Sequence, residues 1–498
     1  MRRLFIHLPL LAGALVMTGS LLAQDVVGPG SPPPVPRGRN ADVSADTYIV
    51  QFSPGTSRND RANAVNVPGA STRFNYGNIS SVAITAPNAN ALQGIRNNPL
   101  VQDVIQAHVI GIMAKGGSKG GGGSSGGGGG GSTGGGGGGS CCSAPGTFDS
   151  EQIISYSVQR TGLPVAGSDG EGIGIAIVDS GIDFQHTDLA PSTAASFSAY
   201  GGSCDDDGGH GTHVSGITAA LNNNQAIVGV APAATLYCVK VLDGALTGDD
   251  TTLMAGLDWV ISNHDQVTPP IRVVNLSLGR PLNAGETLAD VSGMHSLIQQ
   301  LYNLGIVVVV AAGNDPTLEI TDMVPAAFPE VLTVASTTAN EGVKTCAPLG
   351  YDIADVKADD VSVYTTDGAG VTISAPGEEE TDYIDLPYIG CNALMYGTLS
   401  TTMGSQGASR KIPYQGGIAE ARGTSFSAPL VSGIVARLMQ MALIPVDSGS
   451  TTTENARTWI SDNADRKGVA PVDNPMGNVF YTYTFDGTRE GIAQAPQP

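Results

Sequence analysis

Four polar residues stand at the ends of apolar or glycine-rich runs, where they could do chemistry together. They are Asp179 in IGIAIVDSG, His210 in GHGTHVSG, Asn314 in GIVVVVAAGND and Ser425 in RGTSFSAPLVSG. Singly, each has an ordinary structural explanation as a helix cap, a buried polar residue or a turn former. Together they are the residue types that acyl transfer needs: a Ser nucleophile, a His base, an Asp partner for the imidazolium and an amide donor for the oxyanion.

The runs that precede these residues predict the elements that must position them. IGIAIVDSG, ATLYCVKVL, IRVVNLSLG, GIVVVVAAG and VLTVAST are continuous apolar stretches that end in small or turn residues. Strands that are apolar on both faces are typical of parallel sheets covered by helices. Such sheets place their chemistry at the carboxyl ends of the strands. We therefore predict an α/β domain over residues 146–485, built on a mostly parallel sheet flanked by helices.

The segments IVDSGID, HGTHVSG, AAGN and GTSFSAP resemble, in this order, the signature segments of the subtilisin-like serine proteases, the subtilases or peptidase S8 family. The resemblance covers most of the chain after residue 150. It implies a serine endopeptidase with Asp179, His210 and Ser425 as the triad and Asn314 as the oxyanion donor. The second histidine, His213, lies one helical turn away and would point elsewhere.

The resemblance also implies where a substrate binds. Ser277, Leu278 and Gly279 in NLSLG would present their backbone to an extended peptide by strand addition. Ala311, Ala312 and Gly313 would line the opposite wall of the specificity pocket, where small residues leave room for a large apolar side chain. Two other functions stay open, an esterase with the same chemistry and a non-enzymatic binding module. The segment NLSLG favours peptides, and the complete set of four polar residues argues against the binding module.

A metal site is implied by the segment ALNNNQAIVGVAP, which resembles the calcium loop of many subtilases. The side chains of Asp188 and Asn223 and the carbonyls of Leu221, Gln225 and Ile227 would supply oxygen ligands. Oxygen ligands from one tight loop suit calcium better than a transition metal. An Asn-rich turn without an ion is the alternative.

A small α+β unit is predicted over residues 46–113, after a Pro/Gly-rich stretch, 24–45, predicted to be disordered. The strands TYIVQF, ISSVAITAP and LVQDVIQAHVIGI alternate with two helices, and a further strand is possible at STRFNYG. Its size and pattern resemble the inhibitor-like, ferredoxin-like propeptide of subtilases, which covers the cleft of its own enzyme. The glycine-rich stretch 114–145 is predicted to be a flexible linker, and self-cleavage is expected within 107–115.

Export is predicted by the N-terminus, MRRLFIHLPLLAGALVMTGSLLAQ, which has the pattern of a signal peptide cleaved after Ala23. A retained membrane anchor is less favoured because the apolar run is short and broken. The net charge of −21 argues against nucleic-acid binding. We expect an exported monomer, extracellular or held in the periplasm or at the cell surface, whose partners are protein or peptide substrates and its own propeptide.

The six cysteines fit an oxidising compartment and lack the spacing of a zinc site. We predict the disulfides Cys204–Cys238 and Cys346–Cys391, because each pair falls within one region. Cys141 and Cys142 could link to each other, to another chain or to nothing. The last residues, 486–498, are predicted to be a loose tail.

Overall fold

The structure is a computed structural model. It describes residues 42–112, 152, 154–163, 167–224, 226–339, 359, 361–362, 364–379, 396–402, 417–466 and 490–497. All of them belong to one compact unit, Pro36–Pro498. The predicted signal peptide, the glycine-rich linker and four cysteines (Cys141, Cys142, Cys346 and Cys391) lie outside the described residues.

The N-terminal domain is an antiparallel sheet with two helices, as the sequence predicts. Its elements are β1 (Val43–Phe52), α1 (Arg58–Val65), β2 (Ser71–Asn75), β3 (Ser81–Thr85), α2 (Ala89–Arg96) and β4 (Val101–Gly111). The strand order β2-β3-β1-β4 and the βαββαβ sequence are those of a ferredoxin-like domain. Ser57 and Asn88 cap the two helices with side-chain oxygens. The possible strand at STRFNYG is β2.

The large domain, within the described residues, is built on a sheet in the order β16-β15-β14-β13-β11-β9-β5-β7-β6. Its strands are β5 (Gly174–Asp179), β6 (Pro191–Ser198), β7 (Thr235–Lys240), β9 (Ile271–Leu276), β11 (Val307–Ala311), β13 (Leu332–Thr338), β14 (Ile373–Glu379), β15 (Tyr396–Thr402) and β16 (Gly417–Ala421). The pairings from β6 to β14 are parallel, and β15 and β16 add antiparallel ones. Strands β5, β9 and β11 are buried throughout, so the prediction of a helix-covered parallel sheet is confirmed.

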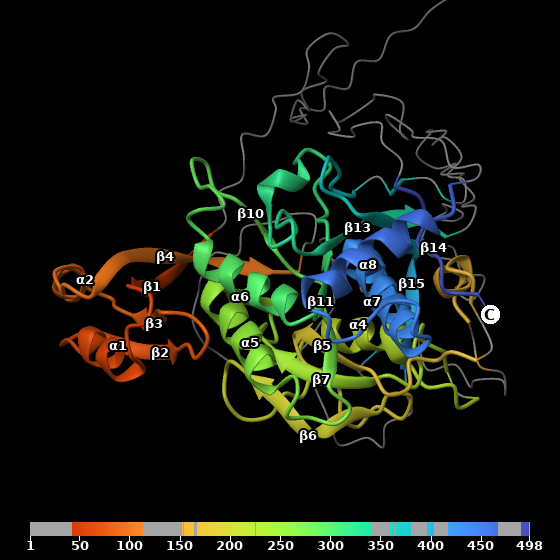
Figure 1. The fold of residues 1–498 in the computed structure, drawn as a ribbon, viewed down its shortest axis with the longest axis horizontal. Coiled ribbons are helices and arrows are strands. Elements are labelled where there is room, and N and C mark those ends of the chain that lie inside the picture. The colour runs from red at the N-terminus through yellow and green to blue at the C-terminus, as the bar shows by residue number, and fades with distance from the viewer. Residues whose placement is uncertain are drawn as a thin grey trace, which may run out of the picture. The chain divides into compact units, whose positions relative to one another are not determined.

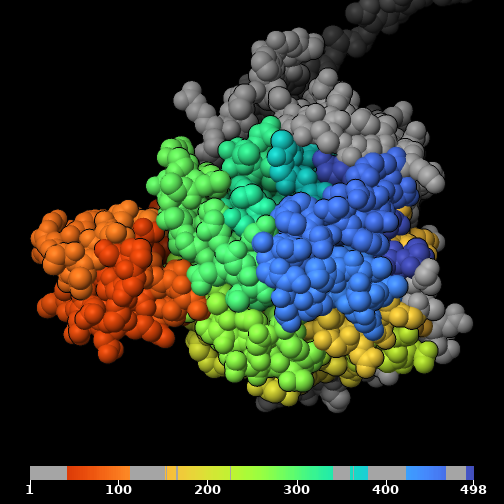
Figure 2. Space-filling view, viewed as in Figure 1, coloured from red at the N-terminus to blue at the C-terminus, as the bar shows by residue number. Residues whose placement is uncertain are grey.

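Helices pack on this sheet in contacting pairs, α4 with α7 and α5 with α6 (Figure 1). The helices are α3 (Tyr156–Arg160), α4 (His210–Ala219), α5 (Asp250–Asn263), α6 (Ser292–Asn303), α7 (Thr424–Gln440) and α8 (Ser450–Asp462). Helix α8 lies beside α6, where the Tyr302 hydroxyl donates to Glu454 at 3.0 Å, and their blue and green segments adjoin on the face in Figure 2. Three short strands complete the domain: β8 (Thr247–Asp249), β10 (Arg280–Pro281) and β12 (Met323–Val324).

The C-terminal segment corrects one prediction, because it is packed rather than loose. Ile492 forms β-bridges with both Ser374 and Asp465. Ile492 and Ala493 are fully buried, and Ala495 is 2% exposed. The short stretch GIAQAP carries little periodic pattern, so its place against β14 depends on contacts with residues distant in the sequence.

Candidate active site

Asp179 and His210 meet at the carboxyl end of the parallel sheet. Asp179 is the last residue of β5, and His210 is the first residue of α4. The His210 Nδ1 atom lies 2.9 Å from Asp179 Oδ1 and 3.0 Å from Oδ2. Asp179 is fully buried and His210 is 8% exposed. This geometry fixes the ring so that Nδ1 faces the carboxylate and Nε2 points away from it.

A second buried carboxylate, that of Asp206, organises the loop that leads to His210. Its Oδ1 accepts the Ser180 hydroxyl and the backbone N–H groups of Gly208 and Gly209, each at 2.9 Å. Its Oδ2 accepts the Thr212 N–H at 2.9 Å and the Thr212 hydroxyl at 2.7 Å. Ser180 follows Asp179, and Thr212 lies two residues after His210. The Asp206 side chain therefore links the two segments that carry the Asp179–His210 pair.

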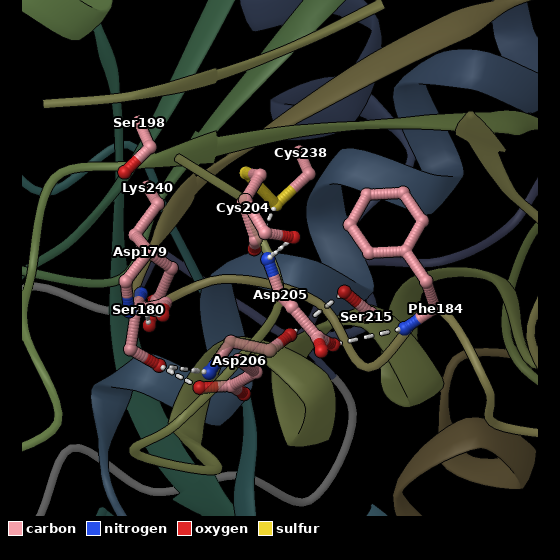
Figure 3. The surroundings of a disulfide bond; sticks show 12 residues. Asp179, Ser180, Phe184, Ser198, Cys204, Asp205, Asp206, Ser215, Cys238 and Lys240 are labelled. Atoms are coloured by element: carbon pink, nitrogen blue, oxygen red, sulfur yellow. Dashed lines mark hydrogen bonds between the residues drawn. A yellow bond between two sulfur atoms is a disulfide. The ribbon is translucent and has the colours of Figure 1, made fainter. Parts of the chain in front are cut away.

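The predicted disulfide Cys204–Cys238 is present and anchors the same loop to β7 (Figure 3). The Cys204 carbonyl accepts the Ile182 N–H at 3.3 Å, so the crosslink also holds the turn after Asp179. Lys240, at the end of β7, is buried and donates to the Ser180 carbonyl and to Asp207. The loop is thus held by a covalent bond, a buried carboxylate and a buried ammonium group.

Ser425 stands at the start of the buried helix α7, after Gly423, whose φ of 152° is strained for any side chain. The Ser425 hydroxyl donates to the Ser277 carbonyl at 3.1 Å, and the Ser277 hydroxyl donates to the Ser425 carbonyl at 2.7 Å. The neighbouring ring of Phe426 lies 5.4 Å from the His210 ring, centroid to centroid. Helix α7 therefore places Phe426, the residue after Ser425, against the His210 ring.

The Asn314 amide is fixed by the residue that precedes Ser425. Its Oδ1 accepts the Thr424 N–H at 2.9 Å and the Thr424 hydroxyl at 3.0 Å. The same hydroxyl accepts the Gly313 N–H at 3.1 Å. With Oδ1 held by Thr424, the N–H donors of the amide face the side of Gly423, whose added Cβ would lie 3.0 Å from Asn314 Nδ2. The ring of His213, the second histidine of HGTHVSG, lies 4.6 Å from the Phe426 ring, centroid to centroid, at an angle of 55°.

The two predicted pocket walls lie at the ends of neighbouring strands. Ser277, Leu278 and Gly279 follow β9, and Ala311 ends β11, with Ala312 and Gly313 directly after it. Their side chains are buried. The sequence reasoning missed Met323 of β12: a Cβ on Gly313 would lie 3.0 Å from Met323 Cε, and Met323 pairs with Pro281 just beyond the other wall. Met323 therefore lies between the walls.

The C-terminal end of β4 lies along this cleft. Gly111 forms an antiparallel bridge with Gly279, with N–H···O distances of 3.3 and 3.0 Å in the two directions. On its other side β4 pairs with β8, from Val109 opposite Asp249 to Gly111 opposite Thr247. The Ile112 N–H donates to the Leu246 carbonyl at 3.4 Å. A peptide strand from this chain is therefore added between Ser277–Gly279 and β8.

Four of the five predicted calcium ligands lie together, with Asp188, from the segment between β5 and β6, packed against the loop after α4. The Asp188 carbonyl accepts the Leu221 N–H at 3.0 Å, and Asp188 Oδ2 accepts the Ile227 N–H at 3.3 Å. Burial raises the pKa of Asp188 to about 7, although hydrogen bonds from Ile227 and Asn223 act in the other direction. Gln225 lies outside the described residues.

One further residue of this cluster was missed by sequence reasoning. The Gln152 amide nitrogen donates to the carbonyls of both Leu221 and Ile227. Gln152 is about seventy positions away in the chain, in a region with no regular pattern, so the sequence carries no local signal for it.

Comparisons with known proteins agree with this geometry. A family profile described as "Subtilase family" matches residues 170–479, more than half of the chain. Subtilisin NAT of Bacillus subtilis subsp. natto is 34% identical over 221 residues, covering 43% of this chain and 54% of that protein. The minor extracellular protease Epr of Bacillus subtilis (strain 168) is 33% identical over 217 residues, covering 42% of this chain and 31% of that protein. The chain thus spans about half the length, or less, of these curated relatives.

A solved structure shares the fold. Fervidolysin from Fervidobacterium pennivorans, described as a keratinolytic enzyme related to subtilisin, superposes with a TM-score of 0.60 at 19% identity. The superposition covers 93% of this chain and 63% of fervidolysin. The fold and the family profile define the class, and the chain belongs to the subtilase family. Within the described part of the chain, no helix has the length and apolar character needed to cross a membrane.

Proposed function

We propose that the protein is a secreted serine endopeptidase that acts through Asp179, His210 and Ser425. The observation that carries the proposal is the buried Asp179–His210 pair beside the Ser425 helix. His210 Nε2 takes the proton of the Ser425 hydroxyl, which attacks the scissile carbonyl. Asp179 holds the imidazolium that forms. Asn314 and the Ser425 N–H bind the oxyanion. As the peptide C–N bond breaks, His210 gives the proton to the leaving amine and the acyl-enzyme forms. His210 then takes a proton from a water molecule, which attacks the ester, releases the acid and restores the Ser425 hydroxyl.

Peptides are favoured over simple esters as substrates, because β4 already lies in the cleft as an added strand. The specificity-pocket walls end in small residues, which favours an apolar side chain before the scissile bond. Met323 between the walls limits the depth of that pocket. Casein and a labelled ester, tested side by side, separate a protease from an esterase. Ser425→Ala abolishes both activities if the triad is assigned correctly.

The N-terminal domain is proposed to be an inhibitory propeptide that the enzyme removes from itself. The register supports a cut soon after Ile112, within the predicted window 107–115. This follows because Gly111 and Ile112 are hydrogen-bonded to the cleft at Gly279 and Leu246. The glycine-rich linker would then stay on the mature enzyme or be trimmed. A Gly/Ser-rich linker with the predicted bounds would span on the order of 30 Å and would hold the propeptide at roughly millimolar effective concentration.

Mass and N-terminal sequencing of the secreted chain test this processing. Wild type is expected to start within or just after residues 107–115, whereas Ser425→Ala keeps the N-terminal domain. A wild-type N-terminus near Ser143, with no cut at 107–115, would contradict self-cleavage at the end of β4. Removal of residues 1–23 in both proteins is the outcome expected of export.

A calcium ion is proposed for the cluster around Asp188. The fit is supported by Asp188 Oδ1, which is buried and has no hydrogen-bond partner among the described residues. It is also supported by the Leu221 and Ile227 carbonyls, which converge on the Gln152 amide. With the amide turned over, Gln152 would offer an oxygen as well, so the donors are all oxygens. The ion would neutralise the buried carboxylate and tie residue 152 to the loop.

Thermal unfolding of the Ser425→Ala protein, which cannot digest itself, tests the ion. Chelation is expected to lower Tm, calcium to restore it, and magnesium to restore it less, since magnesium demands stricter geometry. Gln152→Ala is expected to shrink the calcium-dependent shift. An unchanged Tm on chelation would support the Asn-rich turn without an ion.

A further inference from the structure

Strand β4 continues along the large domain beyond the walls of the predicted specificity pocket. Its register runs from Gly111, opposite Gly279, back through Ile110 to Val109, opposite Asp249. Ile110 is fully buried within the core of the large domain. The Ile110 side chain therefore faces a defined surface of the large domain. That surface is available to a substrate strand which enters along the same path.

His108, three residues before Gly111, faces two buried carboxylates of the large domain. Its backbone N–H donates to Asp250 Oδ2 at 3.0 Å. Its ring Nδ1 lies 3.7 Å from Asp250 Oδ2 and 3.8 Å from Glu286 Oε1. Both distances exceed a hydrogen bond, and Nδ1 is buried without a hydrogen-bond partner among the described residues. The imidazole thus occupies this place without a hydrogen bond to the two carboxylates in front of it.

The two carboxylates are held rigidly by one guanidinium group. Arg280 Nε and Nη2 donate to the two oxygens of Asp250 at 2.9 and 3.1 Å. Its Nη1 and Nη2 donate to the two oxygens of Glu286 at 2.8 and 2.7 Å. The side chains of all three are at most 8% exposed. Two carboxylates against one cation leave an excess negative charge that is already positioned before any ligand arrives.

A hollow beside His108, about 10 Å³ in volume while β4 is in place, has walls suited to the end of a longer side chain. On the large-domain side it is lined by Asp250, Met254, Glu286, Asp290, Val291 and Met294. The methionines and the valine suit the methylene groups of an arginine or lysine, and the three acids suit its charged end. Apart from Gly293, the remaining walls, including Ile105 and His108, belong to the N-terminal domain and leave with it on processing.

We infer that Asp250 and Glu286, with Asp290 at the rim, form a subsite for a basic side chain of the substrate. That side chain is the one three residues upstream of the residue that pairs with Gly279. The inference rests on the proposed protease function, since it needs substrates to bind along the path of β4. It does not rest on the acids alone, because a peptide strand already lies in the groove and places a nitrogen base between them. The ligand class is a protein segment with arginine or lysine at that one position.

A peptide series tests the subsite with the self-processed full-length enzyme. The parent peptide is VIQAHVIGIMAKGGS, residues 104–118 of the chain, and the position of His108 is varied to Arg, Lys, Ala or Glu. We expect kcat/KM for the Arg peptide to exceed that of the Ala peptide about tenfold, and the Glu peptide to be poorer still. The advantage is expected to shrink at high salt.

Variants of the enzyme assign the effect to the carboxylates. In Glu286→Gln, which keeps an acceptor for Arg280, the Arg-to-Ala ratio of kcat/KM is expected to fall towards one. Glu330→Gln is the matched control: Glu330 bonds His295 at 2.9 Å, away from β4, and its change is expected to keep the ratio. Equal cleavage of all four peptides by wild type would refute the subsite alone. No cleavage of any peptide would refute the protease function and the subsite with it.

Discussion

Removing the Cys204–Cys238 crosslink is expected to destabilise the large domain by several kcal/mol. The two cysteines are 34 positions apart, so loop-closure entropy alone predicts a loss of about 4 kcal/mol. The loop they close contains Asp206, Gly208 and Gly209, which lead directly to His210. Freeing this loop therefore weakens the catalytic geometry as well as the fold.

The assay compares urea unfolding of Ser425→Ala with and without Cys204→Ala and Cys238→Ala. Alanine keeps the two buried positions apolar. The chain has two tryptophans, Trp259 and Trp459, both in the large domain, so their fluorescence reports that domain alone. The same cysteine pair changed in an otherwise wild-type chain is expected to lower kcat.

The control is Cys141→Ser with Cys142→Ser, in the predicted linker, which is expected to leave the free energy of unfolding unchanged. A loss below about 1 kcal/mol for the Cys204 and Cys238 pair would show that hydrogen bonds and packing already order the loop. The idea that the covalent bond stabilises the domain by restricting the unfolded chain would then be wrong.

Three further predictions follow from single side chains. Asn314→Ala is expected to lower kcat by about 10²–10³-fold with little change in KM, and a near-wild-type kcat would remove Asn314 from the oxyanion site. Asp206→Ala is expected to lower kcat more than Asp206→Asn. The asparagine can keep the three hydrogen bonds that Oδ1 accepts, but its NH₂ group would face the Thr212 N–H, another donor. Equal kcat values would show that the carboxylate does not position His210. Burial raises the pKa of Glu378 to about 7 from 4.5, so the native state binds the extra proton and stability falls as pH rises from about 4.5 to 7, by on the order of 3 kcal/mol. The free energy of unfolding of Glu378→Gln, measured at pH 5 and pH 8, is therefore expected to rise relative to that of wild type at the higher pH. An equal difference in stability at the two pH values would contradict the raised pKa of Glu378.

Prediction from sequence succeeded where a local pattern carried the information. The apolar runs around Asp179 and Asn314 can only be strands covered on both faces, and parallel strands end at a common edge. That argument places the polar residues together without any knowledge of the contacts between them. The small N-terminal domain was recognised in the same way, from alternating strand and helix patterns over residues 46–113.

The tertiary structure decided what depends on distant residues that carry no pattern. Gln152 reaches the loop at Leu221 and Ile227, and Ile492 bridges to Ser374 where a loose tail was expected. The pairing of Gly111 with Gly279 depends on how the two domains pack against each other, and the sequence of neither segment determines it alone.

The same holds for the charges at the far end of the cleft. No pattern in the sequence connects Asp250, Arg280 and Glu286, yet their side chains are buried together against β4. Periodicity and strand ends fix which residues can meet at an edge of a sheet, because they follow from local backbone geometry. Which particular side chains touch across loops and between domains follows from packing, and only the folded chain settles it.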